Sequence, residues 1–307
     1  MKHRYILYLV SWLFFSVAGF FTACSDEEPL TPSGNDANGF APAAGDHSAE
    51  AKLRNAFYGE TGVYLLFNDT LRHVQSGIGA NGQPQYVTEL VDLSYNLTGD
   101  SYYTLRLKRY YDFEDMEAAT NLFKSFIYTH LGPSIKPYSV LLLHTLEMDD
   151  GYGDGFQPIN YLSNFYCLGI ALGDVTNLTE TDKMNLARSV LKEIVADAIE
   201  DLDYDDYKGA FAAVTEDDIY EFMGDLIPGW DRTQLEELYE LGFMSYEEGW
   251  LGDDPYYDSP LAEWDDMFSL VMDTPWDELE AQWGKYEKIM QQLEIVRDAI
   301  SATGYQF

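Results

Sequence analysis

The sequence predicts an α+β fold, because it combines one long run with helical spacing and several short apolar runs with the length of strands. The helical run spans residues 181–202, where apolar side chains recur every three or four positions and no Gly or Pro intervenes. The strand-like runs are 62–67, 139–144 and 164–172. No internal repeat is present, so residues 49–307 are expected to form a single domain.

Residues 1–23 are expected to be a lipoprotein signal peptide and not part of the fold. A basic start, Met1-Lys2-His3-Arg4, is followed by an apolar run over residues 5–20. Residues 21–24 then read Phe-Thr-Ala-Cys, which fits a signal that is cleaved before a lipid-bearing cysteine. Cys24 is therefore the predicted lipidation site. An ordinary signal peptide or a single membrane span is the alternative.

Residues 24–48 are predicted to be a disordered tether, because they are rich in Pro, Gly, Ala, Asn and Asp. The stretch Ser25-Asp26-Glu27-Glu28 resembles the acidic signal that sends lipoproteins of Bacteroidetes to the cell surface. We therefore expect an outer-membrane lipoprotein that is exposed on the cell surface.

The charge balance is strongly acidic, with 18 Lys and Arg against 53 Asp and Glu and a formal net charge of −35. This balance argues against a nucleic-acid partner and against anionic surfaces. Aromatic residues make up 15% of the chain, which indicates a folded protein with a sizeable core.

The remaining elements follow the same patterns in chain order. Helices are expected over 49–58 and 112–129, a half-buried strand over 104–108, and loops over the Gly-rich residues 76–84 and over 149–155. The Asp/Gly loop at 149–155 does not fit an EF-hand, since Tyr152 and Tyr161 stand where acidic calcium ligands are required. It is predicted to be a solvated turn.

The helix over 181–202 is expected to begin at Thr179, with Asp182 three residues later as a capping partner. Cys167 lies in an apolar run and is expected in the core. Because Cys24 and Cys167 are the only cysteines and Cys24 is predicted to carry lipid, no intramolecular disulfide is expected. The acidic cluster at residues 201–206 has no assigned role.

Within the long helix, residues 192–196 read Lys-Glu-Ile-Val-Ala. Zinc hydrolases carry His-Glu-x-x-His on such a helix, where two His one turn apart bind zinc and the Glu is the general base. Here Glu193 is present, but Lys192 and Ala196 replace both His.

The C-terminal part contains further motifs, namely Leu-Gly-Phe-Met-Ser at 241–245, Asp-Ser-Pro at 258–260, Ala-Glu-Trp-Asp-Asp-Met-Phe at 262–268 and Gln-Leu-Glu-Ile-Val-Arg-Asp at 292–298. In this order they resemble the zinc-binding metallopeptidase lipoproteins of Bacteroidetes, whose members occur beside outer-membrane nutrient-import systems. The resemblance covers residues 50–303. It implies a zincin-like fold with a small mixed sheet packed with helices and a helical C-terminal half.

The resemblance also assigns site positions. The family's zinc-binding His fall on Lys192 and Ala196, its general base falls on Glu193, and its third ligand falls on Asp266. Lys and Ala offer no lone pair to a metal, and one carboxylate does not hold a catalytic zinc ion. No metal ligand is therefore predicted, and Glu193 is a vestigial general base. Lys192 is expected to pair with Asp266 across the vacated site.

The function expected from this resemblance is a non-catalytic accessory or binding component of outer-membrane nutrient uptake, with an import transporter and its lipoproteins as partners and no cofactor. One alternative is an active zinc-dependent metallohydrolase with non-standard ligands. Another is a glycan- or peptide-binding module that uses aromatic residues near Asp, Gly and Pro, namely Trp230, Trp250, Tyr256, Tyr257 and Trp276.

Overall fold

The computed structural model describes residues 38–94, 103–200, 202, 204–215, 221–248, 255–257 and 260–307. Residues Phe40–Phe307 form one compact unit, and Met1–Gly39 form another of which only residues 38 and 39 are described. The predicted signal peptide, Cys24 and most of the tether lie outside the described residues. In the part that is described, no helix is long and apolar enough to cross a membrane.

A mixed sheet is built around strand β5 (Ser139–Asp149). The first half of β5 lies between two parallel neighbours, β1 (Tyr64–Leu66) and β8 (Cys167–Ala171). These strands are almost entirely buried, which is why they appear in the sequence as continuous apolar runs. Strand β7 (Tyr161–Ser163) pairs antiparallel with β8 and ends this side of the sheet.

The second half of β5 continues beyond its parallel neighbours and pairs antiparallel with β4 (Thr104–Arg109) and β6 (Gln157–Ile159). Strand β4 is where a strand was predicted, but its side chains are mostly exposed and not half-buried. The α+β class is confirmed, because parallel and antiparallel strands share one small sheet that is packed with helices.

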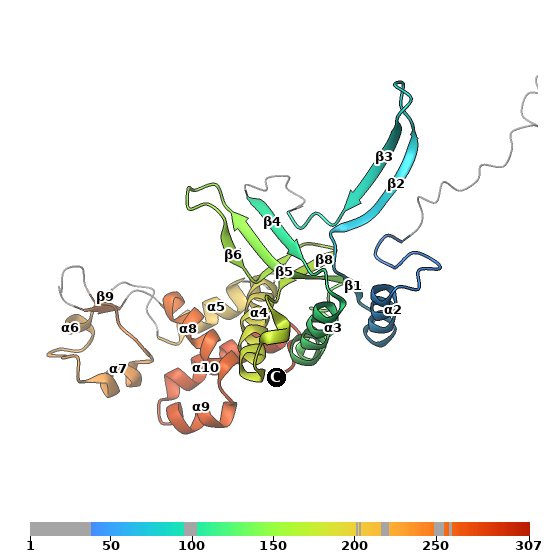
Figure 1. The fold of residues 1–307 in the computed structure, drawn as a ribbon. Helices are drawn as coiled ribbons and strands as arrows, with labels where there is room; N and C mark the ends of the chain where they lie inside the picture. The colour runs from blue at the N-terminus through green and yellow to red at the C-terminus, as the bar shows by residue number, and fades with distance from the viewer. Residues whose placement is uncertain are drawn as a thin grey trace, which may run out of the picture. The chain divides into compact units, whose positions relative to one another are not determined.

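Strands β2 (Thr70–Ile78) and β3 (Pro84–Leu90) form a separate antiparallel hairpin, which projects as a ribbon in Figure 1. The loop predicted over 76–84 is therefore too long, since only residues 79–83 lie between the strands. Gly77 does not end β2, because it stands at a register shift between Gln75 and Gly77 where the pairing bulges.

Helices α2 (Ala49–Thr61), α3 (Phe113–Leu122) and α4 (Glu180–Glu200) accompany the sheet, and α3 and α4 lie on the same side of it in Figure 1. Helix α3 continues into a π-helical turn, Phe123–Ile127, and a final 3₁₀ turn, Tyr128–His130, so a helix over 112–129 is confirmed with a change of hydrogen bonding near its end. The core between these helices and the sheet includes Phe57, Phe123 and Ile170.

Helix α4 begins as predicted, with two reciprocal hydrogen bonds. The Thr179 amide donates to Asp182 Oδ2 at 3.1 Å, and the Asp182 amide donates to Thr179 Oγ1 at 3.2 Å. The apolar face of the helix is buried and includes Val190, Ile194 and Ile199, whereas Met184 near the first turn is exposed.

The C-terminal half is helical apart from two-residue strands. Its elements are α5 (Tyr204–Ala213), β9 (Glu221–Phe222), α6 (Met223–Leu226), α7 (Leu235–Leu241), β10 (Tyr256–Tyr257), α8 (Pro260–Asp273), α9 (Trp276–Trp283) and α10 (Glu287–Ala302). Helix α10 packs against α5, α7 and α8, and its buried residues include Leu293 and Val296.

The residues after α10 are fastened to the segment that precedes β5. The Gly132 amide donates to the Gly304 carbonyl at 3.1 Å, and the Gln306 amide donates to the His130 carbonyl at 3.0 Å. Gly304 has φ +94°, a backbone conformation that residues other than glycine rarely adopt. A Cβ on Gly132 would lie 2.1 Å from the Gly304 carbonyl oxygen, so this contact requires glycine at both positions.

Candidate functional site

Lys192, Glu193 and Ala196 lie on α4 as the sequence predicted, but they do not form an open site. Lys192 Nζ donates to Asp273 Oδ2 of α8 at 2.7 Å, and Arg188 Nε is 3.6 Å from Asp273 Oδ1. Ala196 is partly buried against the core, and Glu193 is exposed. The helix face where two zinc-binding imidazoles would converge therefore carries an ion pair and a methyl group.

The prediction that Lys192 pairs with Asp266 is wrong, because its partner is Asp273. Both Asp266 and Asp273 belong to α8, and seven residues correspond to nearly two full helical turns, so the two carboxylates share one side of the helix. The crossing of α4 and α8 brings the last turn of α8 to Lys192 and leaves Asp266 exposed.

A second acidic residue of α8, Glu263, is buried, with only 3% of its surface exposed. Its Oε1 accepts the backbone amides of Met244 and Ser245 at 2.7 and 3.0 Å, while Oε2 has no hydrogen-bond partner among the described residues. Burial raises the pKa of Glu263 to about 7, assisted by the charge of Asp266 and opposed by the two amides. Glu263 thus fastens the segment after α7 to α8.

The residues at the predicted site do not fit a zinc ion. The Lys192 ammonium has no lone pair, Ala196 has no donor atom, and Asp273 is held by two cations. Within the described ranges, no group of three or more His, Cys, Asp or Glu is placed to hold a metal. Two of the four described His are engaged elsewhere, His73 with Thr88 Oγ1 and His130 with the Gln306 carbonyl.

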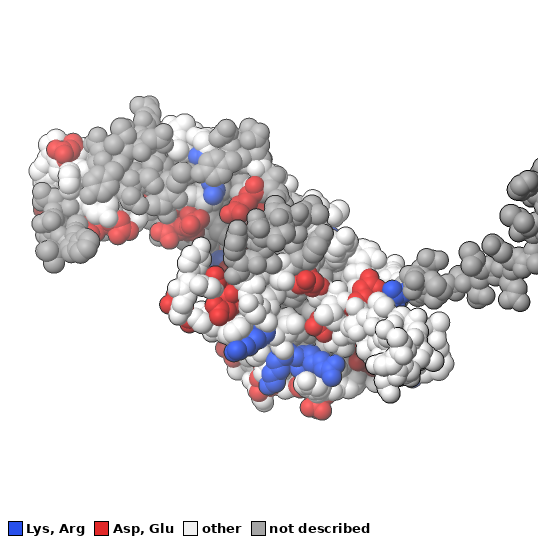
Figure 2. Space-filling model, turned by 90° about the horizontal axis from the view of Figure 1, so that it is seen from above, with Lys and Arg blue, Asp and Glu red and all other residues white. Residues whose placement is uncertain are grey.

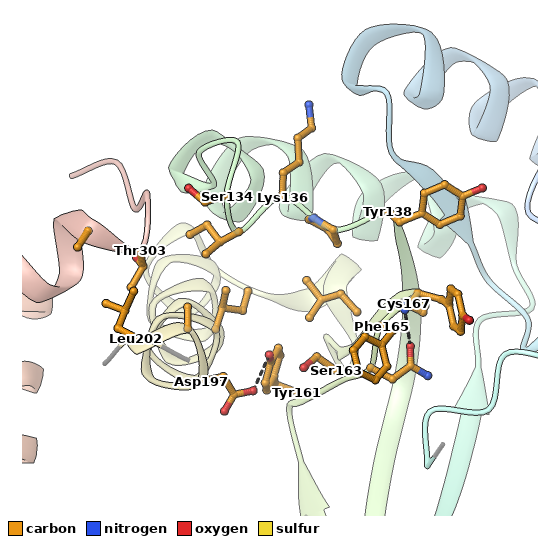
Figure 3. A pocket seen from close by; sticks show the side chains of 18 residues that line it. Ser134, Lys136, Tyr138, Tyr161, Ser163, Phe165, Cys167, Asp197, Leu202 and Thr303 are labelled. Carbon is orange, nitrogen blue, oxygen red and sulfur yellow. Dashed lines mark hydrogen bonds between the residues drawn. The ribbon is translucent and has the colours of Figure 1, made fainter. Parts of the chain in front are cut away.

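A cavity of about 560 Å³ opens beside the C-terminal half of α4, next to strand β7 (Figure 3). Its lining comes from β7, the turn after β7, residues 134–138, α4 and Thr303. On the α4 side, the Tyr161 hydroxyl donates to Asp197 Oδ2 at 2.8 Å. Burial raises the pKa of Tyr161 well above its usual value, and the nearby carboxylates of Asp197 and Glu193 act in the same direction. Tyr161 therefore stays protonated and holds Asp197 in place.

On the β7 side, the cavity lies beside the edge of the sheet, where no other described strand pairs with β7. The Ala171 amide donates to the Asn160 carbonyl and the Asn164 amide donates to the Cys167 carbonyl, so the hydrogen-bonded pairs of this antiparallel ladder alternate from residue 160. The main-chain groups of Tyr161 and Ser163 consequently point away from β8. Both residues line the cavity, whereas Leu162 between them does not.

The turn that joins β7 to β8 carries two exposed aromatic rings, Phe165 at 66% and Tyr166 at 56% exposure. The sequence predicted a strand over 164–172, but β8 begins only at Cys167, and Asn164–Tyr166 is a turn. Cys167 itself is buried as expected, and burial raises the pKa of its thiol to about 12. The two rings were missed because they continue an apolar run.

A second cavity, of about 420 Å³, lies on the other side of this turn. It is lined by the base of the β2–β3 hairpin together with Phe40, Asp92, Asn164 and Tyr166. Asn164 and Tyr166 line both cavities, so the turn forms the ridge that separates them.

Basic side chains are few on this acidic protein, and Figure 2 shows a group of them together on the face seen from above. In the sequence, strand β4 carries three basic residues, Arg106, Lys108 and Arg109. Two of these stack on aromatic rings of the same chain. The guanidinium carbon of Arg106 lies 3.5 Å from the ring centre of Phe156, and that of Arg109 lies 4.8 Å from the ring centre of Tyr111. None of the three lines either cavity beside the Asn164–Tyr166 turn.

The aromatic residues suggested for a glycan or peptide site are largely committed to internal contacts. Trp230 packs edge-on against Tyr246, and Trp276 lies under the Arg297 guanidinium. The main chain of Tyr256 pairs with Glu247. Trp250 lies outside the described residues, as does the Tyr257 side chain.

The chain matches none of the protein families, curated proteins or solved structures with which it was compared. The metallopeptidase family therefore stays a prediction from the sequence motifs.

Proposed function

We propose that this chain is a non-catalytic binding component, displayed on the cell surface by a lipid on Cys24, that serves outer-membrane nutrient uptake beside an import transporter. The observation that carries the non-catalytic part is the ion pair between Lys192 and Asp273. It occupies the helix face on which the related peptidases would hold zinc, and it leaves Glu193 without a metal-bound water to activate.

The cavity beside β7 is the ligand site in this proposal. Its volume of about 560 Å³ falls in the range of small-molecule sites, and it combines exposed aromatic rings with a carboxylate held in place by Tyr161. The strongly acidic chain and its predicted tether suit an exposed protein that stays soluble while it is anchored.

Metal analysis by mass spectrometry tests the non-catalytic reading. We expect the dialysed wild-type protein to contain well under one equivalent of zinc and not to cleave peptides. The double substitution Lys192→His and Ala196→His should bring zinc binding towards one equivalent, because it places two imidazoles one turn apart and releases Asp273. Lys183→His, on the same helix and away from α8, is the matched control and should bind no zinc.

The third ligand in the double-His variant is identified by adding Asp273→Asn or Asp266→Asn. The ion pair of the wild type points to Asp273, whereas the family alignment points to Asp266. Stoichiometric zinc in the unmodified protein, or peptide hydrolysis that a chelator abolishes, would contradict the non-catalytic proposal and favour the metallohydrolase alternative.

The uptake role is tested separately by crosslinking intact cells and isolating the full-length protein with its neighbours. An outer-membrane transporter or its partner lipoprotein should be enriched over a control lipoprotein of similar abundance. Recovery of this chain alone would argue against a role in import and would leave the zinc result unaffected.

A further inference from the structure

We propose that the Asn164–Tyr166 turn is a stacking platform for a neutral oligosaccharide, whose sugar rings extend over Tyr166 from one cavity into the other. This inference rests on the proposed function only in taking the cavity beside β7 as the ligand site. It names the chemical class of that ligand and assigns its recognition to Phe165 and Tyr166.

The backbone of the platform is held by four hydrogen bonds. Asn164 Oδ1 accepts the amides of Tyr166 and Cys167, both at 2.9 Å, and Asn164 Nδ2 donates to the Asp92 carbonyl at 2.7 Å. The Ser139 hydroxyl donates to the Tyr166 carbonyl at 2.6 Å. Two mostly exposed rings are thus held by a fixed backbone, which lowers the entropy that binding would cost.

The groups around the rings suit sugars. A pyranose presents an apolar C–H face, which packs on an aromatic ring, and hydroxyl groups at its edge, which need hydrogen-bond partners. The first cavity is lined by residues that carry such partners, namely the carboxylate of Asp197 and the hydroxyls of Ser134 and Ser163. Figure 3 shows Phe165 beside Ser163, with Tyr161 and Asp197 on the α4 side.

The charges favour a neutral ligand over an acidic one. Asp197 lines the first cavity, and Glu89 and Asp92 line the second. Lys136 is the only cation among the described residues that line either cavity, and its side chain extends away from the first one in Figure 3. Uronic or sulfated sugars would therefore meet net repulsion, which the acidic excess of the whole chain reinforces.

The position of Tyr166 argues for an oligomer. Tyr166 lines both cavities, of about 560 and 420 Å³, so a ligand that fills both must cross the ridge that the turn forms. An extended peptide is the weaker candidate, because β7 has three residues and offers outward main-chain groups only at Tyr161 and Ser163, which gives an added strand few hydrogen bonds.

Isothermal titration of the full-length protein in detergent tests the proposal. The probes are neutral hexasaccharides (maltohexaose, cellohexaose, xylohexaose and mannohexaose), the matching disaccharides, and hexagalacturonate as the acidic counterpart. We expect at least one neutral hexasaccharide to bind, about tenfold or more tighter than its disaccharide, which corresponds to about 1.4 kcal/mol. Hexagalacturonate should not bind.

The variants Tyr166→Ala and Phe165→Ala should each weaken that binding by about tenfold or more. Both rings are mostly exposed, so circular dichroism should find the variants folded. Tyr152→Ala is the matched control, since Tyr152 is 90% exposed and lines neither cavity, and it should bind like the wild type.

Failure of every neutral hexasaccharide to bind would overturn the proposal, and so would binding that Tyr166→Ala leaves unchanged. Equal affinity for disaccharide and hexasaccharide would overturn the spanning of both cavities. These outcomes are distinct from failure of the proposed function, which is decided by the zinc content and peptidase activity of the protein and by crosslinking in intact cells.

Discussion

Lys192 of α4 and Asp273 of α8 are 81 residues apart in the chain, yet Nζ of the lysine lies 2.7 Å from Oδ2 of the aspartate. The pair joins the two helices. The aspartate is the last residue of α8, where a negative charge opposes the helix dipole. Lys192 and Arg188 offset that charge, so the ion pairs link α4 to α8.

The strength of this link is predicted from its exposure. The Lys192 and Asp273 side chains are 24% and 39% exposed, so solvent screens much of their attraction. A double-mutant cycle of Lys192→Met with Asp273→Asn should yield a coupling free energy of about 0.5–1 kcal/mol in urea unfolding. The matched cycle with Asp266→Asn should yield none. Coupling to Asp266 as large as that to Asp273 would contradict the ion pair found here.

Glu263 predicts a pH-dependent stability. Its folded pKa of about 7 lies above its unfolded value, so the folded state binds the proton more tightly. Protonated Glu263 therefore adds to the free energy of unfolding below about pH 4.5, and this stabilisation is lost as the pH rises to about 7. The total loss is about 3 kcal/mol. Glu263→Gln keeps an acceptor for the Met244 and Ser245 amides and carries no charge.

We therefore expect Glu263→Gln to match the wild type near pH 4.5 and to be more stable at pH 8, by up to about 3 kcal/mol in denaturant unfolding. Glu278→Gln at an exposed position of α9 corrects for the loss of one charge. A difference that is constant across this pH range would refute the buried carboxyl as its source.

Gly132 predicts a strong steric effect. Gly132→Ala should lower the free energy of unfolding by about 1–3 kcal/mol, because the added Cβ would collide with the Gly304 carbonyl. Gly59→Ala is the control, since Gly59 lies exposed in α2 with open space at its Cβ, and it should stabilise the protein by about 0.5–1 kcal/mol. Thermal unfolding of both variants measures the contrast.

Cys24 predicts membrane attachment. Cys24→Ala should abolish labelling by a fatty-acid probe and release the protein from the membrane fraction, because no other cysteine precedes the folded unit. Cys167→Ala is the control and should keep both the label and the membrane attachment. Equal labelling of the Cys24 variant and the wild type would reject the lipidation site.

Two of the elements that the sequence predicted, α4 and β5, are buried in a way that leaves a pattern of apolar residues. Helix α4 buries one face and has helical spacing, and β5 is buried on both sides and reads as an apolar run. The β2–β3 hairpin was not predicted, because most of its side chains are exposed and no alternation marks its strands. The hairpin was missed because its side chains are exposed and leave no apolar pattern in the sequence.

The candidate site was predictable only in part. The absence of His at Lys192 and Ala196 can be read from the sequence, although only the resemblance of the C-terminal motifs gives these positions a meaning. The partner of Lys192 cannot, because Asp266 and Asp273 share a helix face and only the crossing of α4 and α8 selects between them. The aromatic platform was hidden for another reason, since Phe165 and Tyr166 are apolar residues directly before a buried strand.

The attachment of Gly304 and Gln306 to the segment before β5 has a consequence during synthesis of the chain. His130 and Gln306 are 176 residues apart, and a ribosome adds roughly 5–20 residues per second. The apolar strand β5 is therefore made roughly 10–35 s before Gly304 and Gln306, which bind the segment in front of it. Until then its neighbourhood is incomplete, and an apolar strand that lacks its neighbours can pair with another molecule.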